Sequence, residues 1–197
     1  MSKAVLISIR PKWCELIANG AKTVEVRKTR PKLETPFKCY IYCTQDKHLA
    51  FMQNQTGTNL IACMDATTGI PAGGAIGNGK VIGELTCDRI DEYDDDTIFS
   101  FRHEDYARWN DFGLDRACMH PEDFQNYADG KWLYGWHISD LKIYDKPKEL
   151  TEFHTWEKCK SCSKSGYEST ACIYDENCMV PVAITKAPQS WCYVEDG

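Results

Sequence analysis

Short stretches in which apolar and polar residues alternate recur along this chain, and they constrain its fold more than any other feature. A period of two puts successive side chains on opposite faces of a strand. Residues 23–27 and 37–43 show this alternation, and residues 5–9 form a run rich in β-branched residues that predicts a buried strand. Further strands are expected at residues 80–87, 136–144 and 191–194.

Helical patterns are few and short. Pro11 suits the first turn of a helix, Trp13 and Ile17 follow at helical spacing, and Asn19-Gly20 should end that helix. A second short helix is expected at residues 121–127. This mixture favours an α+β domain or a mixed β-barrel over a parallel α/β fold.

Turn residues and polar runs predict where the strands are interrupted. Residues 53–79 are polar and rich in Gly, which predicts a long loop, and the acidic run at residues 91–96 predicts a solvated loop. The sequence Asp145-Lys146-Pro147 should end the strand that begins near residue 136.

Charge is distributed unevenly along the chain, which has a net charge of −6. An acidic chain of this kind is not expected to coat nucleic acid nonspecifically. Residues 1–40 nevertheless hold nine Lys or Arg against three Glu, whereas the remainder holds 14 against 26 Asp or Glu. The basic segment could form a local patch that faces phosphates, or its lysines could be solvated residues that pair with the acidic body.

No apolar stretch has the length of a membrane span, and the N-terminus lacks the long apolar stretch of a signal peptide. We therefore expect a cytoplasmic protein with no membrane partner. Thiols stay reduced in that compartment, so many of the 11 cysteines are expected to act as small buried hydrophobes.

The motif Gly20-x-Lys22-x-x-Glu25-x-Arg27 lies where the first predicted helix gives way to a strand. Strand alternation places Glu25 and Arg27 on one face, two residues apart. A carboxylate can accept from the amino group of a base, and Lys or Arg can donate to carbonyl or phosphate oxygens. The alternative is a surface Glu–Arg pair worth under about 1 kcal/mol.

This motif resembles the GxKxxExR signature of ASCH domains, which belong to the PUA-like superfamily. The order of strand, short helix and signature agrees with that family. Residues 135–140, Gly-Trp-His-Ile-Ser-Asp, are also similar to a late barrel strand of PUA-like proteins. The resemblance covers roughly residues 3–150.

The resemblance implies an α+β fold, a PUA-like β-barrel of about five or six strands with flanking short helices. We expect this ASCH domain at residues 1–150 and a Cys-rich C-terminal extension at residues 151–197. The last strand of the extension, at residues 191–194, is expected to dock on the barrel.

The function that the resemblance implies is binding of RNA or of a modified nucleoside or nucleotide, with one base read in a cleft. Lys22, Glu25 and Arg27 would line the cleft, and Arg10, Lys12 and Trp13 would lie at its rim. Trp13 could instead belong to the core. Trp136 and His137 point to opposite strand faces, so one should be buried while the other is free to face the cleft.

A first alternative is an amidohydrolase, because some small bacterial ASCH proteins remove the acyl group of N4-acetylcytidine. In that branch a Thr nucleophile stands at the position of Glu25, assisted by a Lys at the position of Lys22. This chain keeps the Lys and lacks the Thr, and Thr23 is one residue out of register. The assisting acid has no clear match, although three acidic residues lie in the plausible region: Asp111, Asp115 and Glu122.

A second alternative is a protein-interaction adaptor that uses the Cys-rich extension. Cys159-x-x-Cys162 is followed by Cys172 and Cys178, and two thiolates so spaced can reach one metal ion. These four cysteines therefore predict a structural zinc site, with His154 as a substitute ligand. A reduced flexible tail and a disulfide remain alternatives. No organic cofactor is expected.

Overall fold

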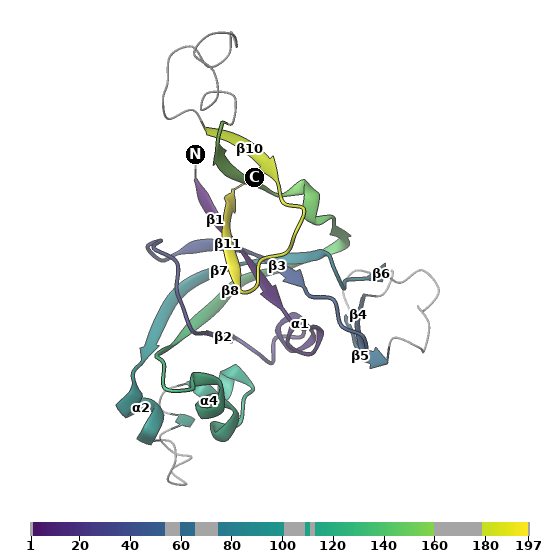
Figure 1. Cartoon of the computed structure of the whole chain (residues 1–197). Helices are drawn as coiled ribbons and strands as arrows, with labels where there is room; N and C mark the ends of the chain where they lie inside the picture. The colour runs from purple at the N-terminus through teal and green to yellow at the C-terminus, as the bar shows by residue number, and fades with distance from the viewer. Residues whose placement is uncertain are drawn as a thin grey trace.

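The structure is a computed structural model that describes residues 2–53, 60–65, 75–100, 109–110, 113–159 and 179–196. Its central element is a six-stranded sheet in the order β11-β1-β3-β7-β8-β2 (Figure 1). β1 and β3 are parallel, and all other neighbours in this sheet are antiparallel. The strands span Lys3–Ile9 (β1), Val24–Arg27 (β2), Phe37–Cys43 (β3), Val81–Tyr93 (β7), Leu133–Lys148 (β8) and Trp191–Glu195 (β11).

Two smaller sheets and short helices surround the central sheet. β4 (Leu49–Gln53) pairs with β5 (Leu60–Asp65) and β6 (Ala75–Ile76), and β9 (His154–Lys158) pairs with β10 (Met179–Ala183). Figure 1 shows the β9–β10 ribbon at one end of the molecule and helices α2 and α4 at the other. The helices are α1 (Pro11–Ala18), α2 (Asp95–Ser100), α4 (Pro121–Ala128) and the 3-10 turns η1 (Leu114–Ala117) and η2 (Leu150–Glu152). None of the described helices is long and apolar enough to cross a membrane.

The fold of mostly strands with few helices agrees with the α+β prediction, but the closed barrel is wrong. β11 and β2 are the two edges of the central sheet, and no backbone ladder joins them among the described residues. Side chains bridge the edges instead, because Trp191 Nε1 on β11 donates to Thr29 Oγ1, just past β2, at 3.0 Å. The sheet therefore curves without closing.

β1 lies inside the sheet and is buried on both faces, as its apolar run predicts. Val5 and Ile7 pack into one core cluster with α1 and Trp136, whereas Ala4 and Leu6 pack into another with Phe153. The strand expected at residues 191–194 is present as β11, which pairs with β1. The division of the chain at residue 150 stays a prediction.

Two predicted loops and one predicted strand end are wrong in part. The segment 53–79 contains β5 and β6, because a short apolar run is embedded among its polar residues. The acidic run 91–96 contains the end of β7, held by the buried ring of Tyr93, and the start of α2. Pro147 lies inside β8, in a stretch between the pairs Gly83–Ile143 and Val81–Lys148 where no ladder needs its missing N–H.

The cysteines that the structure describes are mostly core residues. Cys14, Cys39, Cys43 and Cys87 are buried, and none is in a disulfide. Burial raises the pKa of the Cys39 thiol well above its usual value and that of the Cys87 thiol to about 12. Both thiols therefore stay protonated near neutral pH and behave as small apolar groups.

Gly20 ends α1 as the sequence predicts, with a left-handed φ of +79°. A Cβ added at this position would meet nothing within 4 Å, so only the backbone conformation would penalise a larger residue. We expect Gly20→Ala to lower the free energy of unfolding by about 1–2 kcal/mol, measured by chemical denaturation. Gly20→Asn should lose less, because Asn tolerates this conformation. Equal stability of the Ala variant and the wild type would contradict the backbone argument.

Candidate functional site

A cavity of about 590 Å³ opens between β2, the junction of β1 with α1, and the segment that leads into β11. Five of the six ligand-binding residues predicted from the sequence line it: Arg10, Trp13, Lys22, Glu25 and Arg27. Lys12 is not among the lining residues and is exposed on α1. The structure thus gathers the motif and most of its expected rim around one cleft.

β2 positions the motif because its two faces are both covered. Val24 and Val26 pack on one side against a cluster that includes Phe124 of α4. Glu25 and Arg27 point to the other side, into the cleft, and are only 7% and 8% exposed. The pair is therefore not the exposed surface pair that formed the alternative.

Arg27 joins three separate parts of the chain. Its Nη2 donates to the backbone oxygen of Ser8 at 2.6 Å and lies 2.9 Å from Oε1 of Glu25. Its Nη1 makes a longer contact of 3.5 Å with Oγ of Ser190. One guanidinium thus connects β2, β1 and the residue before β11.

Lys22 is 2% exposed and sits beneath Glu25. Its Nζ donates to the backbone oxygens of Val24 at 2.8 Å and Ala117 at 2.6 Å. The same Nζ lies 3.4 Å from Oε2 of Glu25 and 5.1 Å from the centre of the Trp13 ring. Two of its three N–H groups bind backbone oxygens, and the ammonium group also lies beside the carboxylate and the ring.

The hydrogen-bonding capacity of this cluster is not filled. Among the described residues, Oε2 of Glu25 and Nε of Arg27 are buried and make no hydrogen bond. The contact of Lys22 with Oε2 is an ion pair without hydrogen-bond geometry. A buried acceptor and a buried donor without partners each carry a desolvation cost.

Trp13 serves both roles that the sequence left open. Its ring packs in part against the core cluster of β1 and also lines the cleft. Lys12 Nζ lies 4.8 Å from the ring centre, so two ammonium groups, those of Lys12 and Lys22, lie close to this ring. The ring is a half-buried surface on which a planar ligand could stack.

The sequence did not predict seven further residues that line the cleft: Ser8, Ile9, Val26, Thr44, Met119, Tyr127 and Gln189. A lone Ser within the apolar run of β1 was a usable signal, but nothing local marked the others. Burial raises the pKa of the Tyr127 phenol, with the Arg27 guanidinium opposing the shift. Tyr127 therefore stays a neutral hydroxyl that can donate or accept.

Trp136 and His137 point to opposite faces as expected, but neither lines the cleft. Trp136 is buried in the core. His137 Nε2 lies 2.7 Å from Oδ2 of Asp91, outside the cleft lining. Among the residues considered for amide hydrolysis, Thr23, Asp115 and Glu122 do not line the cleft, and Asp111 lies outside the described residues.

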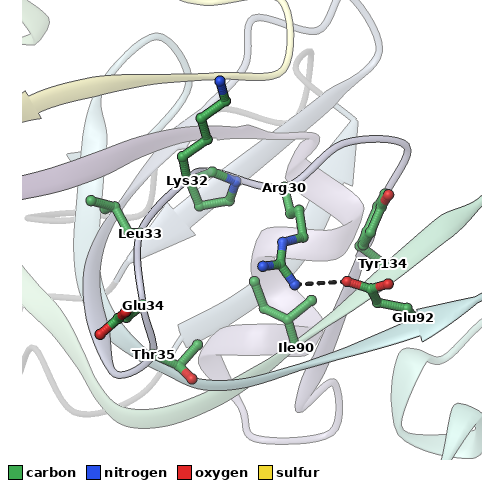
Figure 2. Close-up of a pocket in the computed structure, with 9 residues that line it drawn as sticks. Arg30, Lys32, Leu33, Glu34, Thr35, Ile90, Glu92 and Tyr134 are labelled. Carbon is green, nitrogen blue, oxygen red and sulfur yellow. Dashed lines mark hydrogen bonds and ion pairs between the residues drawn. The ribbon is translucent and has the colours of Figure 1, made fainter.

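A second cavity, of about 840 Å³, lies beneath the segment between β2 and β3 (Figure 2). Its charged groups are exposed, and the ion pair of Arg30 with Glu92, at 2.7 Å, is one that solvent screens. Unlike the smaller cleft, it has no buried charged residue in its lining. The smaller cleft is therefore the better candidate site.

The predicted zinc site cannot be placed. Cys162, Cys172 and Cys178 lie outside the described residues, and Cys159 is half-buried at their edge. Within the described part of the chain, no group of three His, Cys, Asp or Glu could hold a metal ion. Zinc binding by the Cys-rich segment stays a prediction.

A family model for the ASCH domain matches residues 7–177, which include the whole motif. The chain belongs to the ASCH domain family. The match extends past residue 150 into the segment predicted as a Cys-rich extension, and ends before β10.

Solved structures similar to this ASCH domain include ASCH from Zymomonas mobilis, at a TM-score of 0.47 and 18% identity over 75% of this chain and 73% of that chain. Two mutants of the same Zymomonas mobilis protein each give a TM-score of 0.48 at 18% identity. They cover 76% and 75% of this chain and 77% and 74% of their own. No curated protein sequence matches this chain.

The buried Lys22 should be required for stability. Lys22→Met keeps the length of the side chain but leaves two backbone oxygens without their donor and Glu25 with one cation fewer. We expect a loss of about 3–5 kcal/mol in the free energy of unfolding, measured with urea. The matched variant Lys12→Met, at an exposed position, should change stability by less than about 0.5 kcal/mol. A Lys22→Met protein as stable as the Lys12→Met protein would contradict the assignment.

Proposed function

We propose that this ASCH domain binds RNA or a nucleotide and holds one unstacked base in the cleft over Glu25 and Arg27. The observation that carries the proposal is the buried cluster at the floor of the cleft, in which Oε2 of Glu25 and Nε of Arg27 make no hydrogen bond to the described residues. Buried polar groups without partners are unusual in folded proteins and call for an explanation. The edge of a base offers neighbouring donors and acceptors that could complement the carboxylate and the guanidinium that line the cleft.

The walls of the cleft support the same ligand. Single-stranded bases are bound by stacking on aromatic rings while polar groups contact their edges. Trp13 supplies a half-buried ring, and Tyr127 supplies a neutral hydroxyl. A volume of about 590 Å³ falls within the range of small-molecule sites and leaves room for a nucleoside with its sugar.

The charge at the rim favours a ligand that carries phosphate. Arg10 is exposed at the cleft, and no ion pair of its side chain occurs among the described residues. Among the described residues that line the cleft, Glu25 is the only acidic one, and its Oε1 is paired with Arg27. A phosphate attached to the bound nucleoside would meet a cation at the mouth of the cleft.

Glu25→Gln tests the base-binding step. This change keeps the shape of the side chain but replaces an acceptor oxygen by a donor, so an amino-bearing base loses its partner. We expect affinity for the preferred ligand to fall by about 1–3 kcal/mol. Calorimetry against nucleosides, their monophosphates and short RNAs measures it, with Glu122→Gln, exposed on α4, as the control.

The outcomes of that screen separate the functions. Wild-type protein that binds none of these ligands would refute the proposal. Release of acetate from N4-acetylcytidine in the same samples would assign an amidohydrolase instead. Unchanged affinity in Glu25→Gln would remove Glu25 from the binding surface.

Salt should weaken binding of RNA more than binding of a free nucleoside. Each phosphate contacted by a cation releases counterions, and few cations stand at the cleft, so the slope should be shallow. We expect the logarithm of the affinity for a short RNA to fall with the logarithm of salt with a slope of about −1 to −2. The matching nucleoside, which has no phosphate, should show a flat response. Equal slopes for both ligands would contradict a phosphate contact.

A further inference from the structure

The segment between β10 and β11 contributes to the cleft from outside the region that the family model matches. We call residues 184–190 the C-terminal strap. The family match ends at residue 177, so the strap is a part of the site that lies outside the matched region. Its first residue, Ile184, is buried, and the Ile184 N–H donates to the backbone oxygen of Phe153 at 2.8 Å.

The strap is fixed to β1 on both sides of Gln189. The hydroxyl of Ser8 donates to the backbone oxygen of Pro188 at 2.7 Å, and the Ser8 N–H donates to the backbone oxygen of Ser190 at 2.9 Å. Arg27 adds its 3.5 Å contact with the Ser190 hydroxyl. The backbone of Gln189 is thus held in place before any ligand arrives.

Gln189 itself is exposed and lines the cleft. No hydrogen bond of its carboxamide is found among the described residues, in contrast to the paired residues on either side of it. An exposed Gln on a mobile loop would be a solvated side chain of no consequence. A Gln whose backbone is anchored at the mouth of a cleft can bind a ligand with less loss of conformational entropy.

We propose that Gln189 is a specificity-determining residue that reads a base bearing an exocyclic amino group next to a ring nitrogen. This inference rests on the proposed function of the cleft. The carboxamide oxygen accepts from the amino group while its NH₂ group donates to the ring nitrogen, which is the bidentate pairing that an amide makes with adenine. Cytosine carries the same arrangement of amino group and ring nitrogen. Specificity thus comes from the strap, whereas the buried cluster of β2 forms the floor.

Pairs of ligands that differ only in the amino group test this role. Adenosine monophosphate is compared with the monophosphate of purine riboside, and cytidine monophosphate with that of pyrimidin-2-one riboside. Wild-type protein should bind the better amino-bearing ligand at least about tenfold more tightly than its partner. In Gln189→Ala that ratio should fall at least about fivefold, because the amide contact with the amino group is lost while the contact with Glu25 remains.

Two controls keep a structural effect apart from recognition. Gln189→Ala should unfold at the same temperature as the wild type, because the side chain makes no hydrogen bond to the described residues. Gln45→Ala, at an exposed position outside the cleft lining, should keep the wild-type ratio.

Each outcome decides one of the two proposals. A ratio preserved in Gln189→Ala, or a ratio near one in the wild type, would overturn the role of Gln189 and leave nucleotide binding intact. Wild-type protein that binds neither these monophosphates nor short RNA would overturn the proposed function, and the role of Gln189 with it.

Discussion

The guanidinium of Arg27 is the interaction on which the architecture around the cleft depends. β2 and β11 are the two edges of an open sheet, and no backbone ladder joins them among the described residues. Arg27 spans the gap by contacts with Ser8 and Ser190, and Trp191 bonded to Thr29 adds a second bridge. The cleft opens beside these side-chain bridges, because Ser8, Arg27 and Gln189 all line it.

The sequence predicted which residues form the candidate site, but it did not predict that their charged side chains are buried. Period-two alternation correctly put Glu25 and Arg27 on one face of a strand, and helix-end chemistry correctly put Gly20 before them. Burial was not predictable, because charged residues are rarely buried and alternation alone gives an exposed polar face. The rest of the cleft lining includes residues distant in sequence, such as Tyr127 and Gln189, whose position follows from tertiary packing.

In the fold, too, features set by neighbouring residues were predicted, whereas features set by contacts between distant segments were not. Buried strands with continuous apolar runs, such as β1, were predicted because both faces are covered and the pattern says so. The open form of the sheet was not predicted, because it depends on whether the edge strands β2 and β11 pair with each other. Pro147 was expected to end a strand and instead lies in β8, where a register shift removes the need for its N–H. A proline is therefore tolerated inside a strand at a position where the neighbouring strand needs no hydrogen bond from its backbone nitrogen.

Stability alone does not account for the cluster of Lys22, Glu25 and Arg27. Burying charges costs more than a surface pair returns, and apolar replacements of buried ion pairs are often equally stable. In this cluster the charges also hold backbone oxygens of β1, β2 and η1, so removing one disturbs several elements. Groups fixed in this way would need little reorganisation to bind the proposed ligand. If the cleft binds a ligand as proposed, the cost of desolvating these charges has already been met during folding.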